Sequence, residues 1–485
     1  MAVDVEIRVR GGGVLSVPRS ASYLSTYVLL EQEDWFEKEL PFVRRLLQPG
    51  MRAIDVGANF GCYSVAMGRA VGAGGAVWLY EPTAATFGYL RRTLEANDLG
   101  WVRSHQLALS DHEGIGSLAV GENSELNSLG AEAAAGTRER VELTTLDRAR
   151  GAHAIESVDF VKLDAEGEEV RIVAGAQEFF RAEDPLVMFE VKHGTTINAD
   201  LPGAFQRLGY RLYRLVGPDA LLVPASVAAP LDAYELNLFA CKAGRAEVLE
   251  AAGLLINGSA GATDVSGRPD EGLELWRAQP FAAAFGSTVA ARQPLYARAL
   301  SNYALWRDAA RVPAVRHAAL EVALRELLEL TARDATLARL FTLARIGREA
   351  GERAVAVQAL QRIVQALGEG RHALQEPCWP ALERYDALLP LGDVVSWLSA
   401  SAVEALVISA GFSGYFTGPV ALPMLDWLHR CRYASAPMER RRELQAIASG
   451  RQTQIEGSAL LERAGADNLN PQLWTRGATI PRGRG

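Results

Sequence analysis

The stretch that decides the fold is IDVGANFGCYS, residues 54–64, because a short apolar run ends there in an acid and several small residues. The apolar residues before Asp55 predict a buried strand. After Gly61, apolar residues spaced three and four apart predict a helix. Glycine and alanine between the two elements allow backbone to lie close to a ligand. The stretch therefore predicts a strand, a binding loop and a helix.

Four further apolar runs in the first half have the same form, since each ends in a turn or an acidic residue. With the opening run, they occupy residues 51–57, 76–82, 102–111, 158–167 and 185–191. Helix-like segments separate them, and this alternation is typical of an α/β fold with a doubly wound, mostly parallel sheet. Runs at 210–216 and 234–242 predict an antiparallel edge strand. We expect the irregular stretch 114–146 to lie over the carboxyl ends of the strands, where ligands bind in such sheets.

The second half has a different pattern. Residues 257–272 are rich in Gly, Ser and Asp and lack an apolar period, which is typical of a linker. Beyond them helical periodicity dominates, and the turn at 351–353 resembles that of a tetratricopeptide hairpin. The predicted organisation is an N-terminal cap or lid segment (1–50), an α/β domain (51–245), a linker (246–272), an all-α, tetratricopeptide-like helical-hairpin domain (273–465) and a flexible tail (466–485).

The bulk properties narrow the class of protein. The chain has 485 residues, a formal net charge of -8 and no basic run, which argues against a nucleic-acid partner. Its four cysteines are far apart and form no CxxC or Cys/His cluster, so the sequence predicts neither a zinc site nor a disulfide framework. No signal peptide and no apolar run long enough to span a bilayer is evident. A cytoplasmic location is the expectation that follows.

Three interpretations compete for the loop DVGANFG. It could be a plain tight turn, a dinucleotide-binding fingerprint, or the S-adenosylmethionine loop of a Rossmann-like methyltransferase. The dinucleotide fingerprint G-x-G-x-x-G does not fit, because Gly57 and Gly61 enclose three residues without a middle glycine. Small residues suit a close approach to the methionine end of S-adenosylmethionine, and helix N-terminal amides suit its carboxylate. Glu81, which ends the next strand, is placed to bind both ribose hydroxyls, so the methyltransferase hypothesis is favoured.

Seven short motifs follow one another in a fixed order. They are DVGANFG (55–61), YEP (80–82), LALSD (107–111), LNSL (126–129), TTLD (144–147), KLDAEGEE (162–169) and MFEV (188–191). This series resembles the FkbM-type methyltransferases over about residues 30 to 242, and KLDAEGEE is its most specific part. Ala165 departs from the family pattern, which often has a bulkier aliphatic residue there. The resemblance does not extend to the helical half.

The resemblance implies a class I methyltransferase fold and transfer of a methyl group from S-adenosylmethionine to a hydroxyl of a sugar, a glycan or a glycosylated natural product. With the loop argument, it implies that the cofactor is held by Asp55, Gly57, Ala58, Asn59, Gly61, Glu81 and Pro82. It further implies that Ala108 and Leu109 flank the adenine and that Asp111 reaches its edge. It places Asn127 and Ser128 in a lid over the cofactor or acceptor, although a plain polar turn is the alternative.

A hydroxyl acceptor must lose a proton during methyl transfer, which requires a nearby base. The ends of two neighbouring strands carry the candidate catalytic residues Asp164, Glu166, Glu190 and His193. Asp164 could instead contact the cofactor without taking a proton, Glu166 could be a helix N-terminal carboxylate, and His193 could be merely solvated. Lys162 and Lys192 are predicted to contact the substrate.

The same carboxylates could hold a divalent cation, since hard oxygen ligands suit magnesium. The two nearby lysines could neutralise them instead, so we predict no metal site. Tyr27 and Trp35 could cap the acceptor pocket, although packing in the core is the expectation for Trp35.

Two other functions remain open at this point. One is a scaffold whose methyltransferase fold is inactive, but the intact loop and Glu81 argue against it. The other is an N-methyltransferase, but the D/N-P-P-Y loop of many amino-group methylases is absent after the fourth strand. In each case the helical half could bind a protein partner, bind a larger acceptor or mediate self-association.

Overall fold

The computed structural model describes residues 4–120, 128–129, 137–193, 196–197, 200–218, 220–226, 231–257, 270–286 and 289–481. Residues 258–269 of the predicted linker lie outside this set, and the domain boundaries remain predictions.

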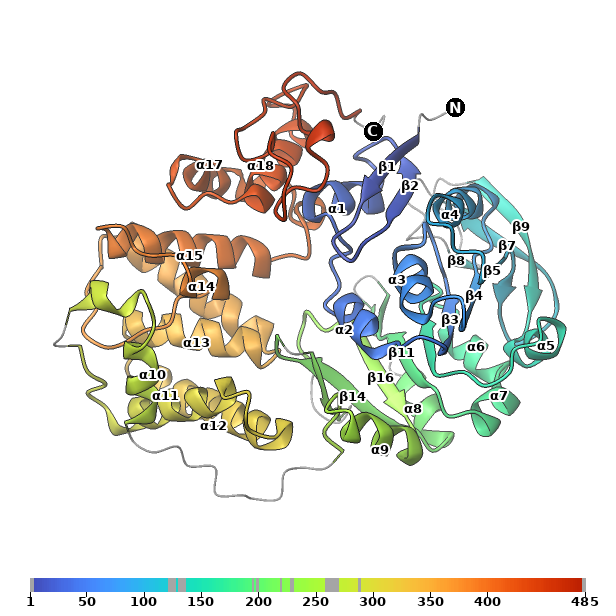
Figure 1. Ribbon diagram of the computed structural model, residues 1–485, viewed down its shortest axis with the longest axis horizontal. Coiled ribbons are helices and arrows are strands. Elements are labelled where there is room, and N and C mark those ends of the chain that lie inside the picture. Colours follow the sequence, from blue (N-terminus) through green and yellow to red (C-terminus); the bar gives the residue numbers. More distant parts are fainter. Residues whose placement is uncertain are drawn as a thin grey trace.

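An eight-stranded sheet with helices on both faces forms the first half (Figure 1). Its strand order is β15-β14-β16-β11-β10-β3-β4-β5, and the five strands from β11 to β5 are parallel. They are β3 (Arg52–Val56), β4 (Ala76–Tyr80), β5 (Val102–His105), β10 (Phe160–Leu163) and β11 (Leu186–Glu190). The helices are α3 (Cys62–Val71), α4 (Ala84–Ala96), α5 (Leu146–Ala152), α6 (Glu169–Ala174), α7 (Gln177–Ala182) and α8 (Asp200–Arg207). The predicted doubly wound α/β fold is confirmed.

The predicted antiparallel edge of the sheet is confirmed. β16 (Asn237–Cys241) lies between β11 and β14 (Arg211–Val216), antiparallel to both. The edge is formed by β15 (Leu221–Pro224), which makes a hairpin with β14. All five residues of β16 are buried, as expected for an interior strand.

The register brings the functional strand ends together. Asp55 on β3 pairs with Lys162 on β10, and Val56 pairs with both Leu163 and Tyr80. Because the parallel strands end at one edge of the sheet, the segments that follow them meet there.

The stretch 114–146 contributes to a second sheet of order β6-β9-β7-β8. Its strands are β6 (Ala108–Leu109), β7 (Gly114–Val120), β8 (Ser128–Leu129) and β9 (Thr137–Thr144). A two-stranded sheet also joins β12 (Lys192–His193) to β13 (Thr196–Ile197).

The N-terminal segment packs on the main domain. It comprises β1 (Asp4–Arg8), β2 (Val14–Pro18), α1 (Leu24–Gln32) and α2 (Glu39–Leu46). The amide of Ser16 on β2 donates to Thr93 Oγ1 on α4 at 3.0 Å, and Asn97 of the same helix end bonds Val14 in both directions. This segment is therefore tied along its length to the helix that follows β4.

The second half is helical (Figure 1). Its helices are α9 (Ala243–Ala251), α10 (Glu271–Arg277), α11 (Pro294–Arg307), α12 (Pro313–Arg333), α13 (Leu337–Glu349), α14 (Arg353–Gly368), α15 (Val394–Ser409), α16 (Gly414–Thr417), α17 (Leu422–Arg430) and α18 (Ala436–Ala448). α11 packs on α12 and α13 on α14, and Gly351 adopts the left-handed φ of +77° in the predicted turn. The helical domain is confirmed, whereas its tetratricopeptide-like character remains a prediction.

The C-terminal end returns to the N-terminus instead of forming the predicted flexible tail. α18 packs on α1, and the side chain of Trp474 is fully buried in the same hydrophobic core as β1 and β2. The side-chain amide of Asn470 donates to the Arg8 carbonyl at 3.0 Å, and the Arg8 amide donates back at 2.9 Å. Aromatic and amide side chains that find partners at the N-terminus explain why residues 466–481 are ordered.

Among the described residues, no single helix has the length and apolar character needed to cross a membrane. Two helices bent by 85° at a break, Val394–Ser409 and Gly414–Arg430, meet the criteria of length and composition together.

Candidate active site

A cavity of about 510 Å³ lies at the carboxyl ends of β3, β4, β10 and β11. The size is typical of a small-molecule site, and the position is where open α/β sheets bind ligands. Its remaining walls come from the N-terminal segment, from residues near 234 and from the helical half: Leu24, Ser25, Trp35, Phe36, Glu37, Tyr234, Leu236, Ala410, Gly411, Phe412, Phe416 and Thr417. The cavity is thus built from three parts of the chain that are far apart in sequence.

The loop after β3 has a conformation that requires glycine. Gly57 has a φ of +73°, and a Cβ added there would lie 1.8 Å from the carbonyl oxygen of Asp164. Gly57 and Ala58 donate their amides to the Tyr80 carbonyl at 3.0 and 3.1 Å. Gly61, with a φ of +97°, immediately precedes α3. Gly57, Ala58 and Asn59 all line the cavity, as predicted, so backbone is presented to whatever binds there.

Glu81 follows β4 and lines the cavity beside this loop. Its Oε2 accepts the Asn59 amide at 3.1 Å, and its Oε1 accepts both the amide and the hydroxyl of Thr83. Burial raises the pKa of the Glu81 carboxyl, while the Thr83 and Asn59 donors act in the opposite direction. A carboxylate has about four acceptor positions, so three donors orient this group and leave room for a ligand hydroxyl.

Asp55 is placed differently from the prediction. It is fully buried beneath the loop and is not among the described residues that line the cavity. Its Oδ2 accepts the Ser64 hydroxyl at 2.7 Å, and its Oδ1 lies 3.7 Å from Lys162 Nζ. Burial raises the pKa of Asp55. This residue positions the loop and the lysine instead of touching a ligand.

Lys162 lines the cavity, but its ammonium is already bonded within the protein. Nζ donates to Asp164 Oδ2 at 2.9 Å and to the Gly57 carbonyl at 3.2 Å. Burial alone would lower the pKa of Lys162, but Asp164 and Asp55 outweigh it and raise that pKa. The lysine therefore links β10 to the loop. Its ammonium has a structural role in this arrangement, in place of the predicted substrate contact.

Apolar residues line the end of the cavity beyond Glu81. Pro82, Ala108 and Leu109 are there, as predicted for a base-binding surface. Asp111 is not among the lining residues: it accepts hydrogen bonds from Arg171 at 2.8 and 3.2 Å and contacts His112. The Arg171 guanidinium, with His112, holds the pKa of Asp111 well below its usual range. Glu168, which is buried and accepts the Ser110 hydroxyl at 3.3 Å, lines the cavity in its stead.

Four further carboxylates line the cavity: Glu37, Asp164, Glu166 and Glu190. Burial and, after it, repulsion from the neighbouring acids, Asp164 foremost, together raise the pKa of Glu190 to about 11. Glu190 therefore carries a proton near neutral pH in this structure and is poorly suited to act as a base there. Asp164 is paired with Lys162, whose Nζ lies 2.9 Å from its Oδ2.

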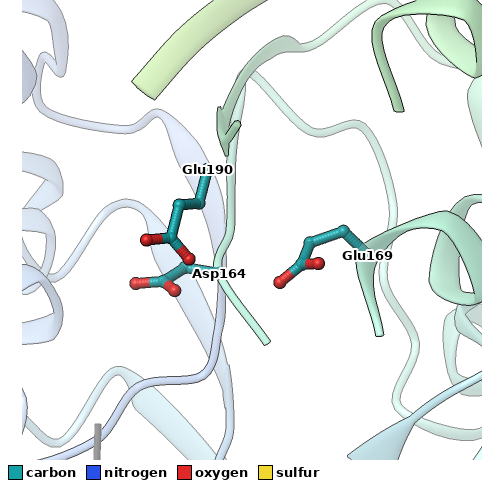
Figure 2. Close-up of side chains that lie close together, drawn as sticks. All are labelled: Asp164, Glu169 and Glu190. Carbon is teal, nitrogen blue, oxygen red and sulfur yellow. The ribbon is translucent and has the colours of Figure 1, made fainter. Parts of the chain in front are cut away.

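Asp164, Glu169 and Glu190 are the group of described residues that could hold a metal ion, since one oxygen from each lies within 4.8 Å of the others. Figure 2 shows the Asp164 and Glu190 carboxylates side by side, with Glu169 facing them from α6. However, Glu169 already accepts the amides of Ala165 at 2.8 Å and Gly167 at 3.1 Å. It closes a turn in which Glu166 has a φ of +52°, so its carboxylate has a structural role in this arrangement.

Sequence reasoning missed several residues of the acceptor end. Glu37 lines the cavity, and its Oε2 accepts the Tyr63 hydroxyl at 2.5 Å. Burial raises the pKa of Glu37, as does the nearby Asp164. The stretch EDWFEKEL did carry a signal, because four acids lie on either side of its aromatic residues. Phe412 and Phe416 carried none, since they lie hundreds of residues away in an apolar helical region.

Trp35 lines the cavity, whereas Tyr27 is buried outside it. Other predicted residues cannot be placed at side-chain level. Asn127 lies outside the described residues, and Ser128, Lys192 and His193 lie in β8 and β12, whose side chains are also outside the described part of the chain. Their roles remain predictions.

Comparison with known proteins agrees with the motif series. Residues 55–212 match the family model of the methyltransferase FkbM domain. This part of the chain is therefore similar to a methyltransferase domain of that type. No curated protein matches the chain.

Similar solved structures include three methyltransferases. Methyltransferase FkbM from Methylobacillus flagellatus KT is 16% identical, with a TM-score of 0.27, over 42% of this chain and 50% of that one. A SAM-dependent O-methyltransferase from Thermotoga maritima is 17% identical, with a TM-score of 0.26, over 42% and 64%. The O-methyltransferase from Bacillus cereus in complex with SAH is 14% identical, with a TM-score of 0.28, over 45% and 87%. The chain thus spans about half the length of the first of these, and no functional conclusion rests on likenesses this distant.

Proposed function

We propose that this protein is an S-adenosylmethionine-dependent O-methyltransferase that methylates a hydroxyl of a sugar, a glycan or a glycosylated natural product. The observation that carries the proposal is the pairing of Glu81 with the loop 57–61 in a cavity that several other carboxylates also line. The match of residues 55–212 to the FkbM domain supports the same reaction class.

The residues at the loop end fit this cofactor. Glycine at position 57 lets the loop lie directly against the Asp164 carbonyl, beside the cavity that Gly57 lines. Glu81 would accept a ribose hydroxyl, and Ala108 and Leu109 would pack against the adenine. Amides at the start of α3 would hold the carboxylate of the methionine part. The bound cofactor supplies a methyl group on a positively charged sulfur, which is a good leaving group.

Methyl transfer has two requirements that the protein must meet. The acceptor oxygen must be held in line with the methyl carbon, because positioning supplies much of the rate when the leaving group is good. The hydroxyl proton must pass to a base as the new carbon–oxygen bond forms and the carbon–sulfur bond breaks. Asp164 and Glu166 are the proposed base candidates that line the cavity, and His193 stays a third candidate. Glu190, protonated near neutral pH, would donate a hydrogen bond to the acceptor instead.

Transfer of a labelled methyl group from S-adenosylmethionine to a panel of glycosides would test the proposal. We expect a methyl ether on a sugar hydroxyl, identified by NMR of the purified product, together with release of S-adenosylhomocysteine. Asp164→Asn should reduce the rate while leaving cofactor affinity within a few-fold of normal. A label found on an amino group would refute O-methylation. Methyl transfer to another compound but to none of the glycosides would refute the proposed class of acceptor.

A further inference from the structure

The cavity has a wall that does not belong to the methyltransferase domain. Residues 410–417, at the turn between α15 and α16, contribute Ala410, Gly411, Phe412, Phe416 and Thr417 to its lining. The family match ends at residue 212, so this wall is specific to the longer chain. The loop 57–61, Glu81 and the apolar surface beyond it account for the cofactor end, which leaves this wall to the acceptor.

Aromatic rings dominate the wall. The Phe36 ring centroid lies 5.4 Å from that of Phe412 and 5.7 Å from that of Phe416, and the two helical-half rings are 6.0 Å apart. The Trp35 ring lies 4.7 Å from that of Phe36, tilted by 45°. Phe416 is 50% exposed, which is unusual for a phenylalanine that has three ring neighbours within reach. The cluster therefore offers apolar faces to a ligand instead of being sealed in a core.

The wall is held in place by buried polar contacts with the N-terminal segment. Glu31 accepts the Gly414 amide at 2.8 Å and two donors of Arg441 at 2.9 and 2.6 Å, and all three residues are buried. The side-chain amide of Gln32 donates to the Phe412 carbonyl at 2.7 Å. Arg353 lies over the Phe412 ring with its guanidinium carbon 4.5 Å from the centroid. A charge buried against several partners fixes its neighbours, so these rings form a preorganised surface.

We propose that Phe412 and Phe416, together with Phe36, select the acceptor by packing against the apolar face of a saturated ring, so that the helical half sets the specificity of the methyltransferase domain. The inference rests on the proposed function and narrows its substrate to ring-shaped molecules. Flat aromatic faces favour a rigid ring with C–H groups on one side over a flexible chain of equal polarity, because the ring loses less conformational freedom on binding. The carboxylates at this end would accept hydrogen bonds from the hydroxyl groups on the ring.

The test uses the full chain saturated with S-adenosylhomocysteine and two uncharged probes. Methyl β-D-glucopyranoside presents axial C–H groups on each ring face, and D-sorbitol is an open-chain polyol. Saturation-transfer difference NMR measures which probe contacts the protein and, by titration, how tightly. The variants are Phe412→Ala and the half-exposed Phe416→Ala. Val420→Ala is the matched control, since Val420 is 80% exposed in the adjoining turn and does not line the cavity.

We expect the glycoside to bind and sorbitol not to bind. Each Phe→Ala variant should bind the glycoside about fivefold more weakly, which is the scale of one lost ring contact. Phe412→Tyr and Val420→Ala should keep the affinity of the unmodified chain for the glycoside. Cofactor affinity should stay within twofold in all variants. Equal binding of both probes, no glycoside binding by a protein that binds the cofactor, or undiminished glycoside binding in both Phe→Ala variants would overturn the inference. Failure of the unmodified chain to bind S-adenosylhomocysteine would refute the proposed function instead.

Discussion

Replacing Glu81 by glutamine tests the cofactor end of the cavity with little change in shape. The carboxylate accepts the Asn59 and Thr83 amides at 3.1 Å each and the Thr83 hydroxyl, and its remaining acceptor position would take a ribose hydroxyl. A hydrogen bond to a charged group contributes about 1.5–3 kcal/mol and a neutral one about 0.5–1.5 kcal/mol. Loss of charge at this ribose contact should therefore cost about 1–1.5 kcal/mol. That corresponds to roughly 5- to 12-fold weaker binding of S-adenosylhomocysteine.

Isothermal titration calorimetry measures this loss directly. Glu139→Gln is the matched control, because Glu139 accepts the Ala84 amide at 2.9 Å at the start of the same helix α4 but does not line the cavity. The control should bind S-adenosylhomocysteine as tightly as the unmodified chain. A Glu81→Gln variant that folds normally and binds within about threefold of normal would show that Glu81 serves only to orient Asn59 and Thr83.

Three further predictions concern the loop, the acid cluster and the two halves. Gly57→Ala should abolish binding of S-adenosylhomocysteine in calorimetry, because its methyl group would collide with the Asp164 carbonyl. The control Gly72→Ala, also at positive φ but with nothing within 4 Å, should lose only the stability that corresponds to its own backbone strain. Glu190→Gln should make the melting temperature less dependent on pH. The folded state keeps the proton of Glu190 up to a pKa of about 11, whereas the unfolded chain releases it near 4.5. Ionisation of this group therefore lowers the stability of the unmodified chain as pH rises between those values. A chain ending at residue 244 should aggregate during expression, because it loses α18 and Trp474 from the core that β1, β2 and α1 share with them.

Each of these outcomes has a clear opposite. Normal affinity in Gly57→Ala would mean that the loop can move away from the Asp164 carbonyl without disturbing the binding site. Identical pH profiles of the melting temperature in Glu190→Gln and the unmodified chain would contradict the raised pKa. A monodisperse shortened chain that binds S-adenosylhomocysteine would show that the two halves fold independently.

The parallel sheet and the cofactor loop could be predicted from sequence because their signals are local. Apolar runs that end in DVG and YEP indicate strand ends directly, and Gly57 and Glu81 lie where that pattern places them. The position of β16 inside the sheet could not be predicted, since a buried run such as NLFAC is equally compatible with an edge or an interior strand.

Local sequence patterns did not predict the positions of residues whose role depends on distant partners. Asp55 looks like a ligand contact in sequence, but Lys162 and Ser64 bury it beneath the loop. Asp111 is drawn to Arg171, a residue on α6 that no local pattern links to it. The acceptor wall depends on Phe412, whose approach to Phe36 is a property of the fold and not of either segment.

Local sequence patterns also could not predict that the C-terminal segment packs on the N-terminal segment. Residues 466–485 are polar and rich in glycine, which is typical of a frayed end. Burial of Trp474 and the paired hydrogen bonds of Asn470 with Arg8 outweigh that tendency for the described part of this segment.

Calorimetric titration of the full chain with S-adenosylmethionine and S-adenosylhomocysteine, each with and without magnesium, tests the central claim most directly. The account predicts saturable binding at one site per chain for both compounds, with affinities unchanged by magnesium. The absence of binding under all four conditions would contradict it and would leave the helical half as the place to look for function. Binding that requires magnesium would show that Asp164, Glu169 and Glu190 act as metal ligands and not as the protein's own acid cluster.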